Sequence, residues 1–389
     1  MTARTAKAAL AGLTAAACAL PAAAEEISVG LLLPFSGVYA SLGQDIEAGF
    51  RLGIETYGGE TDATFAISTA DTEAKPPVAL AAARKMILQD EVDALVGVVS
   101  SGVLAAVRDV VHGAEVPLVV ANAGNDEATG EDCSPFITRV SFSNGQVNRP
   151  MGRWLAEQGV ERVYTLAADY AAGHQMIEAF AEGFAEGGGE VVGQGFTPFG
   201  QTQDFGPYLA QAQASGADAI YAFYAGGEAI SFVQQYDSFG LKEALPLYGA
   251  GFLTSALYVD AQGEAAEGVV AALHYVPAIE NEANAAFVDA FRSAEGRLPS
   301  EYAVHGYDAA RALVEAAKTG ATDRAGLAEA LRGVSFEGPR GRLSIDPATN
   351  NVVQPIYVYR TVAGEGGLTQ EILAELPAEA DPANGCEME

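Results

Sequence analysis

The chain has 389 residues, enough for two or three domains with filled cores, and 49% of them are hydrophobic. Its 51 acidic residues outnumber its 21 lysines and arginines, which gives a formal net charge of −30 at pH 7. A surface this acidic repels nucleic acid and anionic lipid headgroups, so neither is expected as a partner.

The first 24 residues have the pattern of a targeting signal. Arg4 and Lys7 precede an apolar stretch that ends at Pro21, and the alanines after it fit a cleavage site. The apolar stretch is too short to span a bilayer. We therefore expect an exported, periplasmic protein with residues 1–24 as its signal peptide, cleaved after Ala24.

The three cysteines leave two questions open. Lipidation at Cys18 is the alternative to cleavage after Ala24, but Ala15 stands where a lipoprotein signal usually has leucine. After export, Cys133 and Cys386 remain, and they either form one disulfide that ties the tail to the body or stay free thiols. The sequence has no Cys-x-x-Cys or Cys/His cluster, so no structural metal site is expected.

Strand-like and helix-like segments alternate through the first half of the chain. Residues 27–35 are a continuous apolar run, typical of a fully buried strand, and the next segment places Ile46, Phe50, Ile54 and Tyr57 on one helical stripe. Two prolines suit the first turn of a later helix. Further strand units are expected at 64–71, 92–102 and 116–124. This is the pattern of a parallel sheet covered on both faces.

The alternation starts again in the second half. Residues 161–173 form a strand and loop, followed by a helix with Met176, Phe180 and Phe184 on one stripe and three glycines at its end. Two more strand units follow at 216–230 and 245–252. Each half therefore offers helix N-termini at the carboxyl ends of its strands, where open α/β sheets bind ligands.

Sequence patterns for catalysis are absent. The sequence contains no P-loop, no dinucleotide-binding glycine pattern, no H-E-x-x-H and no G-x-S-x-G. The histidines, each isolated in the sequence, are expected to be surface or core residues: His112, His174, His274 and His305. An enzyme and a cofactor are therefore not expected. The pattern that remains is a binding protein, whose two lobes close by a hinge on a small molecule.

The residues resemble the leucine/isoleucine/valine-binding family, the periplasmic solute receptors of branched-chain-amino-acid-type ABC importers. The resemblance covers about 27–362, with "SGVYASLGQD", "DTEAKPPVALAAARKMI", "VDALVGVVSSG", "VPLVVANAGN", "FITRVSFSN", "DYAAG", "YAGGEA" and "HGYDAARALVEA" in order. It implies a type I periplasmic binding fold, with two doubly wound parallel-sheet lobes joined by a three-strand hinge. It places lobe one at 26–143 and 275–345, lobe two at 144–274 and 346–362, and a tail at 363–389.

The resemblance also implies a ligand site. In members that bind α-amino acids, the ligand carboxylate meets a serine and backbone N–H groups at a helix start, and Ser101 falls on that serine, beside Ser100. Asn122 and Gly124 fall on neighbouring contacts, although Gly124 cannot supply the side-chain hydroxyl of the family pattern.

Aromatic residues are expected around the same cleft. Ser36 and Tyr39 would form a wall in lobe one, with Tyr170, Tyr224 and Gly226 closing from lobe two. Each aromatic residue, including Phe252, either stacks on a ligand ring or packs in the core.

The charge pattern of the expected site departs from that of amino-acid binders. Those members carry an acid where this chain has Gly251, and an ammonium buried without an anion costs several kcal/mol. Glu228 either replaces that acid or is a carboxylate favoured by the start of its helix. The surrounding motifs are most similar to members that take up aromatic carboxylates such as benzoates.

Three functions follow as hypotheses. The first is a monomeric receptor that captures a small carboxylate and delivers it to an ABC permease in the inner membrane. A branched-chain or other amino-acid receptor of the same family is the alternative to an aromatic-acid receptor. A ligand-sensing receptor of a signalling system uses the same fold, but no kinase or membrane segment is fused to this chain.

Overall fold

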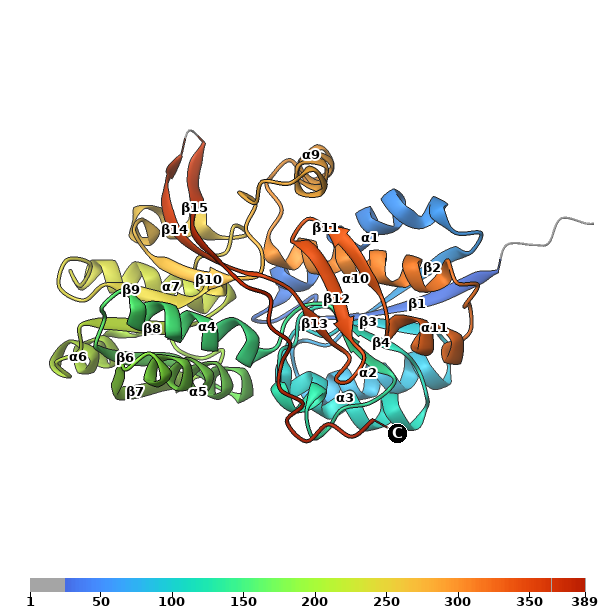
Figure 1. Cartoon of the computed structure of the whole chain (residues 1–389), viewed down its shortest axis with the longest axis horizontal. Coiled ribbons are helices and arrows are strands. Elements are labelled where there is room, and N and C mark those ends of the chain that lie inside the picture. Colours follow the sequence, from blue (N-terminus) through green and yellow to red (C-terminus); the bar gives the residue numbers. More distant parts are fainter. Residues whose placement is uncertain (1–24, 365, 389) are drawn as a thin grey trace, which may run out of the picture.

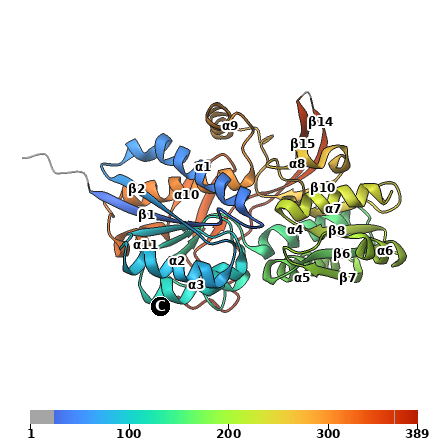
Figure 2. The same cartoon turned by 180° about the vertical axis from the view of Figure 1, so that it is seen from behind.

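The computed structural model describes residues 25–364 and 366–388, which form two α/β lobes side by side (Figure 1). The expected signal peptide, its cleavage after Ala24 and Cys18 lie outside these residues. Among the described helices, none is long and apolar enough to cross a membrane. Each lobe has its own central sheet with helices on both faces, as the view from behind also shows (Figure 2).

The first sheet has eight strands in the order β11-β12-β13-β5-β4-β3-β1-β2. The strands from β2 to β13 run parallel, and β12 and β11 are antiparallel additions. Its strands are β1 (Glu26–Leu33), β2 (Thr64–Asp71), β3 (Ala94–Gly97), β4 (Leu118–Val120), β5 (Ile137–Arg139), β11 (Ser335–Gly338), β12 (Gly341–Asp346) and β13 (Asn351–Val353). Its helices are α1 (Ala40–Tyr57), α2 (Pro76–Leu88), α3 (Ser101–Gly113), α9 (Glu282–Glu295), α10 (Glu301–Ala317) and α11 (Arg324–Leu331), with short turns η1 (Gly58–Glu60) and η2 (Asp126–Thr129).

Burial of strand β1 on both faces explains why its sequence is a continuous apolar run. Leu31 and Leu33 belong to the cluster that includes Ile46 and Phe50 of α1, whereas Leu32 packs in the cluster of α2 and α3. Successive side chains of a strand point to opposite faces, so a strand covered by helices on both faces is apolar at every position.

The second sheet has seven strands in the order β15-β14-β10-β9-β8-β6-β7. Its strands are β6 (Arg162–Asp169), β7 (Glu190–Pro198), β8 (Ala219–Phe223), β9 (Leu247–Ala250), β10 (Val270–Leu273), β14 (Ile356–Gly364) and β15 (Gly367–Leu376). Its helices are α4 (Asn144–Glu157), α5 (Ala171–Glu186), α6 (Gly206–Ala214), α7 (Gly226–Ser238) and α8 (Val259–Gln262), with turns η3 (Gly251–Thr254) and η4 (Gly263–Ala266). Strands β6 to β10 are parallel, and β14 and β15 are antiparallel.

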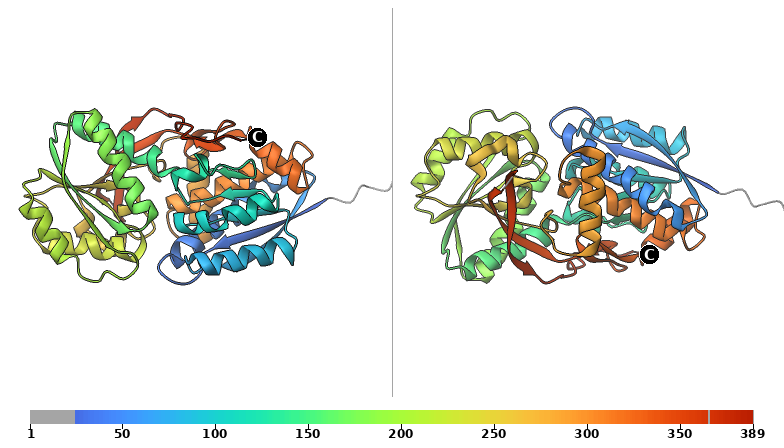
Figure 3. Two further views of the ribbon diagram at one scale, coloured as in Figure 1. Left: turned by 90° about the horizontal axis from the view of Figure 1, so that it is seen from below. Right: turned by 90° about the horizontal axis from the view of Figure 1, so that it is seen from above.

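The chain crosses between the sheets after β5, after β10 and after β13, and the views from below and above show the two lobes it connects (Figure 3). The segment 346–362, which the sequence analysis assigned to lobe two, is divided between the sheets. Asn351 pairs with Arg139 in the first sheet, and β14 begins the second sheet's edge only at Ile356. The segment 363–389 is also not wholly a tail, because β15 pairs with the otherwise open edge of β14.

A buried arginine joins the crossover segments to the first lobe. Arg340 forms an ion pair with Asp308 of α10 at 2.7 Å, and both side chains are almost fully buried. Its guanidinium also donates to the carbonyl oxygens of Val140 at 2.6 Å and Ser141 at 3.0 Å, and it contacts the amide of Gln354. The crossovers after β5 and after β13 are thus both attached to one side chain.

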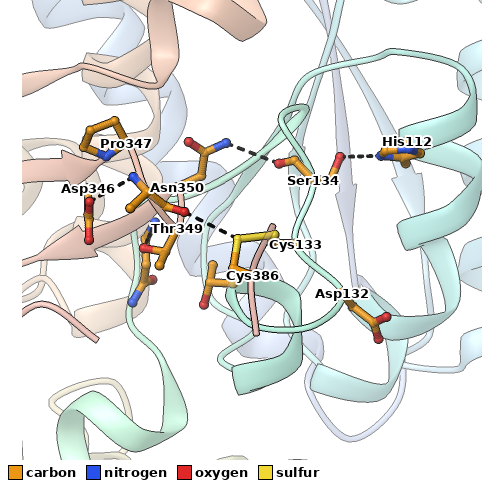
Figure 4. Close-up of a disulfide and its surroundings, with 12 residues drawn as sticks. His112, Asp132, Cys133, Ser134, Asp346, Pro347, Thr349, Asn350 and Cys386 are labelled. Atoms are coloured by element: carbon orange, nitrogen blue, oxygen red, sulfur yellow. Dashed lines mark hydrogen bonds between the residues drawn. A yellow bond between two sulfur atoms is a disulfide. The ribbon is translucent and has the colours of Figure 1, made fainter. Parts of the chain in front are cut away.

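The C-terminal segment makes a fourth connection between the lobes. After β15 of the second sheet, the carboxylate of Glu379 accepts from Arg153 of α4 at 2.8 Å. The chain then reaches the first lobe, where Cys386 forms a disulfide with Cys133 (Figure 4). Of the two states that the sequence left open, the structure therefore shows the disulfide.

Two pairs of helices, α1 with α10 and α4 with α5, pack in backbone contact. This contact fixes the positions of the helix ends that face the other lobe. A Cβ on Gly49 of α1 would lie 1.8 Å from the carbonyl oxygen of Ala303 in α10, and one on Gly183 of α5 would lie 2.0 Å from that of Arg149 in α4. Only glycine permits such close contact between helices. The first turns of these four helices carry side chains of the site described below.

Candidate functional site

A small cavity of about 20 Å³ lies between the lobes. Its walls come from the carboxyl ends of parallel strands in both sheets, where open α/β folds bind ligands. Ser101 follows β3, Asn122 and Gly124 follow β4, Tyr170 follows β6 and Phe252 follows β9. The full lining is Tyr39, Leu42, Val99, Ser101, Asn122, Gly124, Phe142, Asn144, Tyr170, Ala172, Met176, Phe223, Ala225, Phe252 and Tyr302.

Hydrogen-bond donors gather at the start of α3. Ser101 is the first residue of this helix, and Ser100 precedes it with extended backbone (φ −83°, ψ 133°). The first N–H groups of a helix have no acceptor within the helix, and together with the helix dipole they favour an anion. The Ser101 hydroxyl adds a side-chain donor on the cavity wall.

Aromatic rings form much of the remaining wall. Phe142 and Phe252 pack with ring centroids 4.9 Å apart, and Phe252 meets Phe223 edge-on at 6.1 Å. The hydroxyls of Tyr39 in the first lobe and Tyr170 in the second lie 3.0 Å apart, so the lobes are in contact here. Burial raises the pKa of both tyrosines, so both remain neutral at physiological pH.

No charged side chain of the described residues lines the cavity. A Cβ on Gly251 would lie 2.4 Å from Cβ of Leu273, so this position has no room for an acidic side chain. Glu228 does not line the cavity either. Its carboxylate accepts from the backbone N–H of Gly200 at 3.0 Å, and burial raises its pKa. The cavity is therefore uncharged, with donors at one helix start and rings around it.

Comparison with known proteins identifies the family. The profile of the periplasmic binding protein family matches residues 26–366. The chain belongs to this family. A Leu/Ile/Val-binding protein homolog 6 from Brucella melitensis is 31% identical over 353 residues, which cover 88% of this chain and 90% of the relative.

Solved structures share the whole architecture. A solute-binding protein of an ABC transporter from R. palustris, in complex with benzoate, is 34% identical with a TM-score of 0.86, over 94% of this chain and 99% of that one. Another from Rhodopseudomonas palustris BisB5, in complex with 3,4-dihydroxybenzoic acid, is 33% identical with a TM-score of 0.87, over 92% and 99%. The type I periplasmic binding fold expected from the sequence is confirmed. The protein is thus an extracytoplasmic solute receptor of the branched-chain-amino-acid ABC-transporter type, not an enzyme.

The structure brings part of the predicted site together. The predicted residues that line the cavity of this binding protein are Tyr39, Ser101, Asn122, Gly124, Tyr170 and Phe252. Ser100 and Gly226 do not line it but lie next to lining residues at the starts of α3 and α7.

Besides Glu228, two further predicted residues lie elsewhere. Ser36 is exposed, and its hydroxyl donates to the carboxylate of Asp71 at 2.7 Å, so it fixes the loop after β1. Tyr224 is fully buried within the second lobe, edge-on to Phe205 at 5.2 Å. The reason is strand alternation: Phe223 points into the cavity, so the next side chain points away from it.

Other lining residues were not predicted from the sequence. Phe142 lies in the loop after β5 and Asn144 begins α4 at the end of that loop, so the rule that ligands meet strand ends could have found them. Phe223 and Met176 appeared only as parts of a strand and a helical stripe. Tyr302 comes from α10 of the third chain segment, and no local signal places it at the cavity.

Proposed function

We propose that this receptor captures a small aromatic carboxylate between its lobes and delivers it to the permease of an ABC importer. The observation that carries the proposal is an uncharged cavity that combines aromatic walls with the first turn of α3. A carboxylate at Ser101 would accept hydrogen bonds from the hydroxyl and the helix start, while its ring packs against Phe142, Phe252 and Tyr170.

Free amino acids fit this cavity less well. An ammonium group would be buried without an anion, since the described lining has no acid and Gly251 has no room for one. The uncompensated charge would cost several kcal/mol. The solved relatives bound to benzoate and to 3,4-dihydroxybenzoic acid support an aromatic ligand. The Leu/Ile/Val-binding name of the 31% identical relative makes an amino-acid receptor the second candidate.

Capture and release follow from contacts between the lobes. The hydroxyl contact of Tyr39 with Tyr170 and the bonds of Gln175 in α5 with Asp126 and Glu127 of the first lobe hold the cavity closed. Opening breaks these few polar contacts, while the crossovers stay attached through Arg340. Because one chain supplies both walls, we expect the receptor to act as a monomer.

The test is calorimetry and thermal shift of the mature protein with two panels of ligands. Benzoate, hydroxybenzoates and p-coumarate form one panel, and leucine, isoleucine, valine, phenylalanine and glutamate form the other. A ligand at 100 times its Kd stabilises the folded protein by about 2.7 kcal/mol, a visible shift. Binding of ring acids alone supports the proposal, whereas binding of amino acids alone refutes it.

A substitution locates the carboxylate. Ser101→Ala removes one donor to a charged group, so affinity for the ring acid falls by about 1–3 kcal/mol. Ser36→Ala is the matched control, because that serine lies outside the cavity and is expected to leave affinity unchanged. Equal affinities of Ser101→Ala and the wild type would place the carboxylate elsewhere.

A further inference from the structure

Two buried amide oxygens of residues on the cavity wall have no hydrogen-bond partner within residues 25–364 and 366–388. They are Oδ1 of Asn122 and Oδ1 of Asn144, whose side chains are 7% and 0% exposed. Buried acceptors are nearly always paired in folded proteins, so an unpaired one on a cavity wall indicates a group that the ligand supplies.

The orientation of the Asn144 amide is set by a relay of hydrogen bonds that begins at Glu127 in the first lobe and passes through Gln175. Nε2 of Gln175 lies 2.6 Å from both carboxylate oxygens of Glu127, which only accept hydrogen bonds when ionised. Oε1 of Gln175 therefore faces the opposite way, and it accepts from Nδ2 of Asn144 at 2.8 Å and from the backbone N–H of Asp126 at 3.2 Å. The amide of Asn144 is thus left with its acceptor oxygen free.

The Asn122 amide is fixed more simply. Its Nδ2 donates to the carbonyl oxygen of Val99 at 3.0 Å. A carbonyl cannot donate, so the reversed amide would place two acceptors against each other. Both asparagines consequently present an acceptor, not a donor.

Because residue 124 is glycine, no side chain at this position covers the oxygen of Asn144. A Cβ at this position would lie 2.5 Å from Oδ1 of Asn144 and 2.5 Å from Cε2 of Phe142. Any side chain would therefore cover the oxygen or displace it. The lack of a hydroxyl-bearing side chain at 124, which departs from the amino-acid-binding pattern, thus leaves the amide oxygen without a donor from this position.

We infer that the natural ligand is a hydroxylated aromatic acid, whose ring hydroxyl donates to Oδ1 of Asn144 while its carboxylate meets Ser101. An acceptor oxygen repels a carboxylate and accepts from an O–H, so the two ends of the ligand are distinguished. Asn122 offers an acceptor for a second hydroxyl. The inference rests on the proposed function, since it specifies the aromatic acids that the same cavity takes.

The experiment compares ligands that differ only in ring hydroxyls. Calorimetry of the mature wild type measures Kd for benzoate, 3-hydroxybenzoate, 4-hydroxybenzoate and 3,4-dihydroxybenzoate. At least one hydroxylated acid is expected to bind about 10-fold tighter than benzoate, the value of one neutral hydrogen bond. Asn144→Ala is expected to abolish that preference, and benzoate affinity changes less than that of the hydroxylated acid.

A second variant tests the relay, and it keeps the proposal testable if Asn144→Ala does not fold. Gln175 is a positioning residue outside the cavity lining, so Gln175→Ala frees the Asn144 amide to reverse and reduces the preference for the hydroxylated acid. Gln158→Ala, at the exposed C-cap of α4, is the matched control and keeps the full preference. A merely structural role for Gln175 would weaken all the acids alike.

The outcomes separate this inference from the proposed function. Equal wild-type affinity for benzoate and every hydroxybenzoate overturns the hydroxyl contact but leaves an aromatic-acid receptor. Equal losses for all acids in Asn144→Ala overturn it in the same way. Binding of amino acids without any ring acid overturns both.

Discussion

Glu301 provides the sharpest test of the electrostatics beside the cavity. It is the first residue of α10, next to Tyr302 on the cavity wall, and it is 2% exposed. Its carboxyl accepts from the hydroxyl of Ser255, in the other lobe, at 2.8 Å. Burial raises the pKa of Glu301 to about 8, with a smaller contribution from the charge of Asp45.

The raised pKa makes stability depend on pH. Between the ordinary pKa of 4.5 and about 8, folded Glu301 holds a proton that the unfolded chain releases. The unfolded state then binds fewer protons, so the free energy of unfolding falls as pH rises through this window. The folded and the ordinary pKa of Glu301 differ by about 3.5 (8 − 4.5). At about 1.4 kcal/mol for one pKa unit, the free energy of unfolding falls by at most about 5 kcal/mol across this window.

Glu301→Gln removes this titration and keeps the shape of the side chain. At pH 5 the wild type carries a neutral carboxyl, so the two proteins are expected to have similar stability. At pH 9 the variant is expected to be more stable, by up to about 5 kcal/mol. Urea unfolding of both proteins from pH 5 to pH 9 measures the difference in their free energies of unfolding. The contributions of titrating groups that the two proteins share cancel in this difference.

The matched control is Glu282→Gln, which changes the exposed first residue of α9 and is expected to give no such trend. A constant difference between wild type and Glu301→Gln across the range would refute the reasoning. It would show that Ser255 and the surroundings stabilise the carboxylate as well as they stabilise the acid.

Three further changes test the cross-link, the cavity wall and the hinge. Replacing both Cys133 and Cys386 by serine releases a link across 253 residues, so guanidinium unfolding should show a loss of about 2–5 kcal/mol; equal midpoints would contradict this. Gly251→Asp crowds Leu273, which should cost about 1–3 kcal/mol; calorimetry should detect no leucine binding, and a gain of it would show that an acid fits. Arg340→Met leaves a buried carboxylate unpaired, a loss of about 3–5 kcal/mol in urea unfolding, and an unchanged midpoint would disprove that role.

The sequence by itself determined the layered α/β architecture and the region of the site. The apolar run through Leu31, Leu32 and Leu33 indicates a strand covered on both faces, because a one-sided strand would alternate. Small polar residues after such strands, at Ser101 and Asn122, mark the sheet edge where ligands bind. Local periodicity is enough for these features because each depends on neighbours a few residues away.

Only the tertiary structure decided which side chains face the cavity and what they offer. Tyr224 was displaced from the predicted site because Phe223 occupies the inward side of β8, and Tyr302 joins from a distant segment. The acceptor character of Asn144 depends on Gln175, 31 residues away, which is oriented by Glu127 at a separation of 48 residues. Side-chain direction and amide orientation are set by contacts across the fold, so no local pattern in the sequence encodes them.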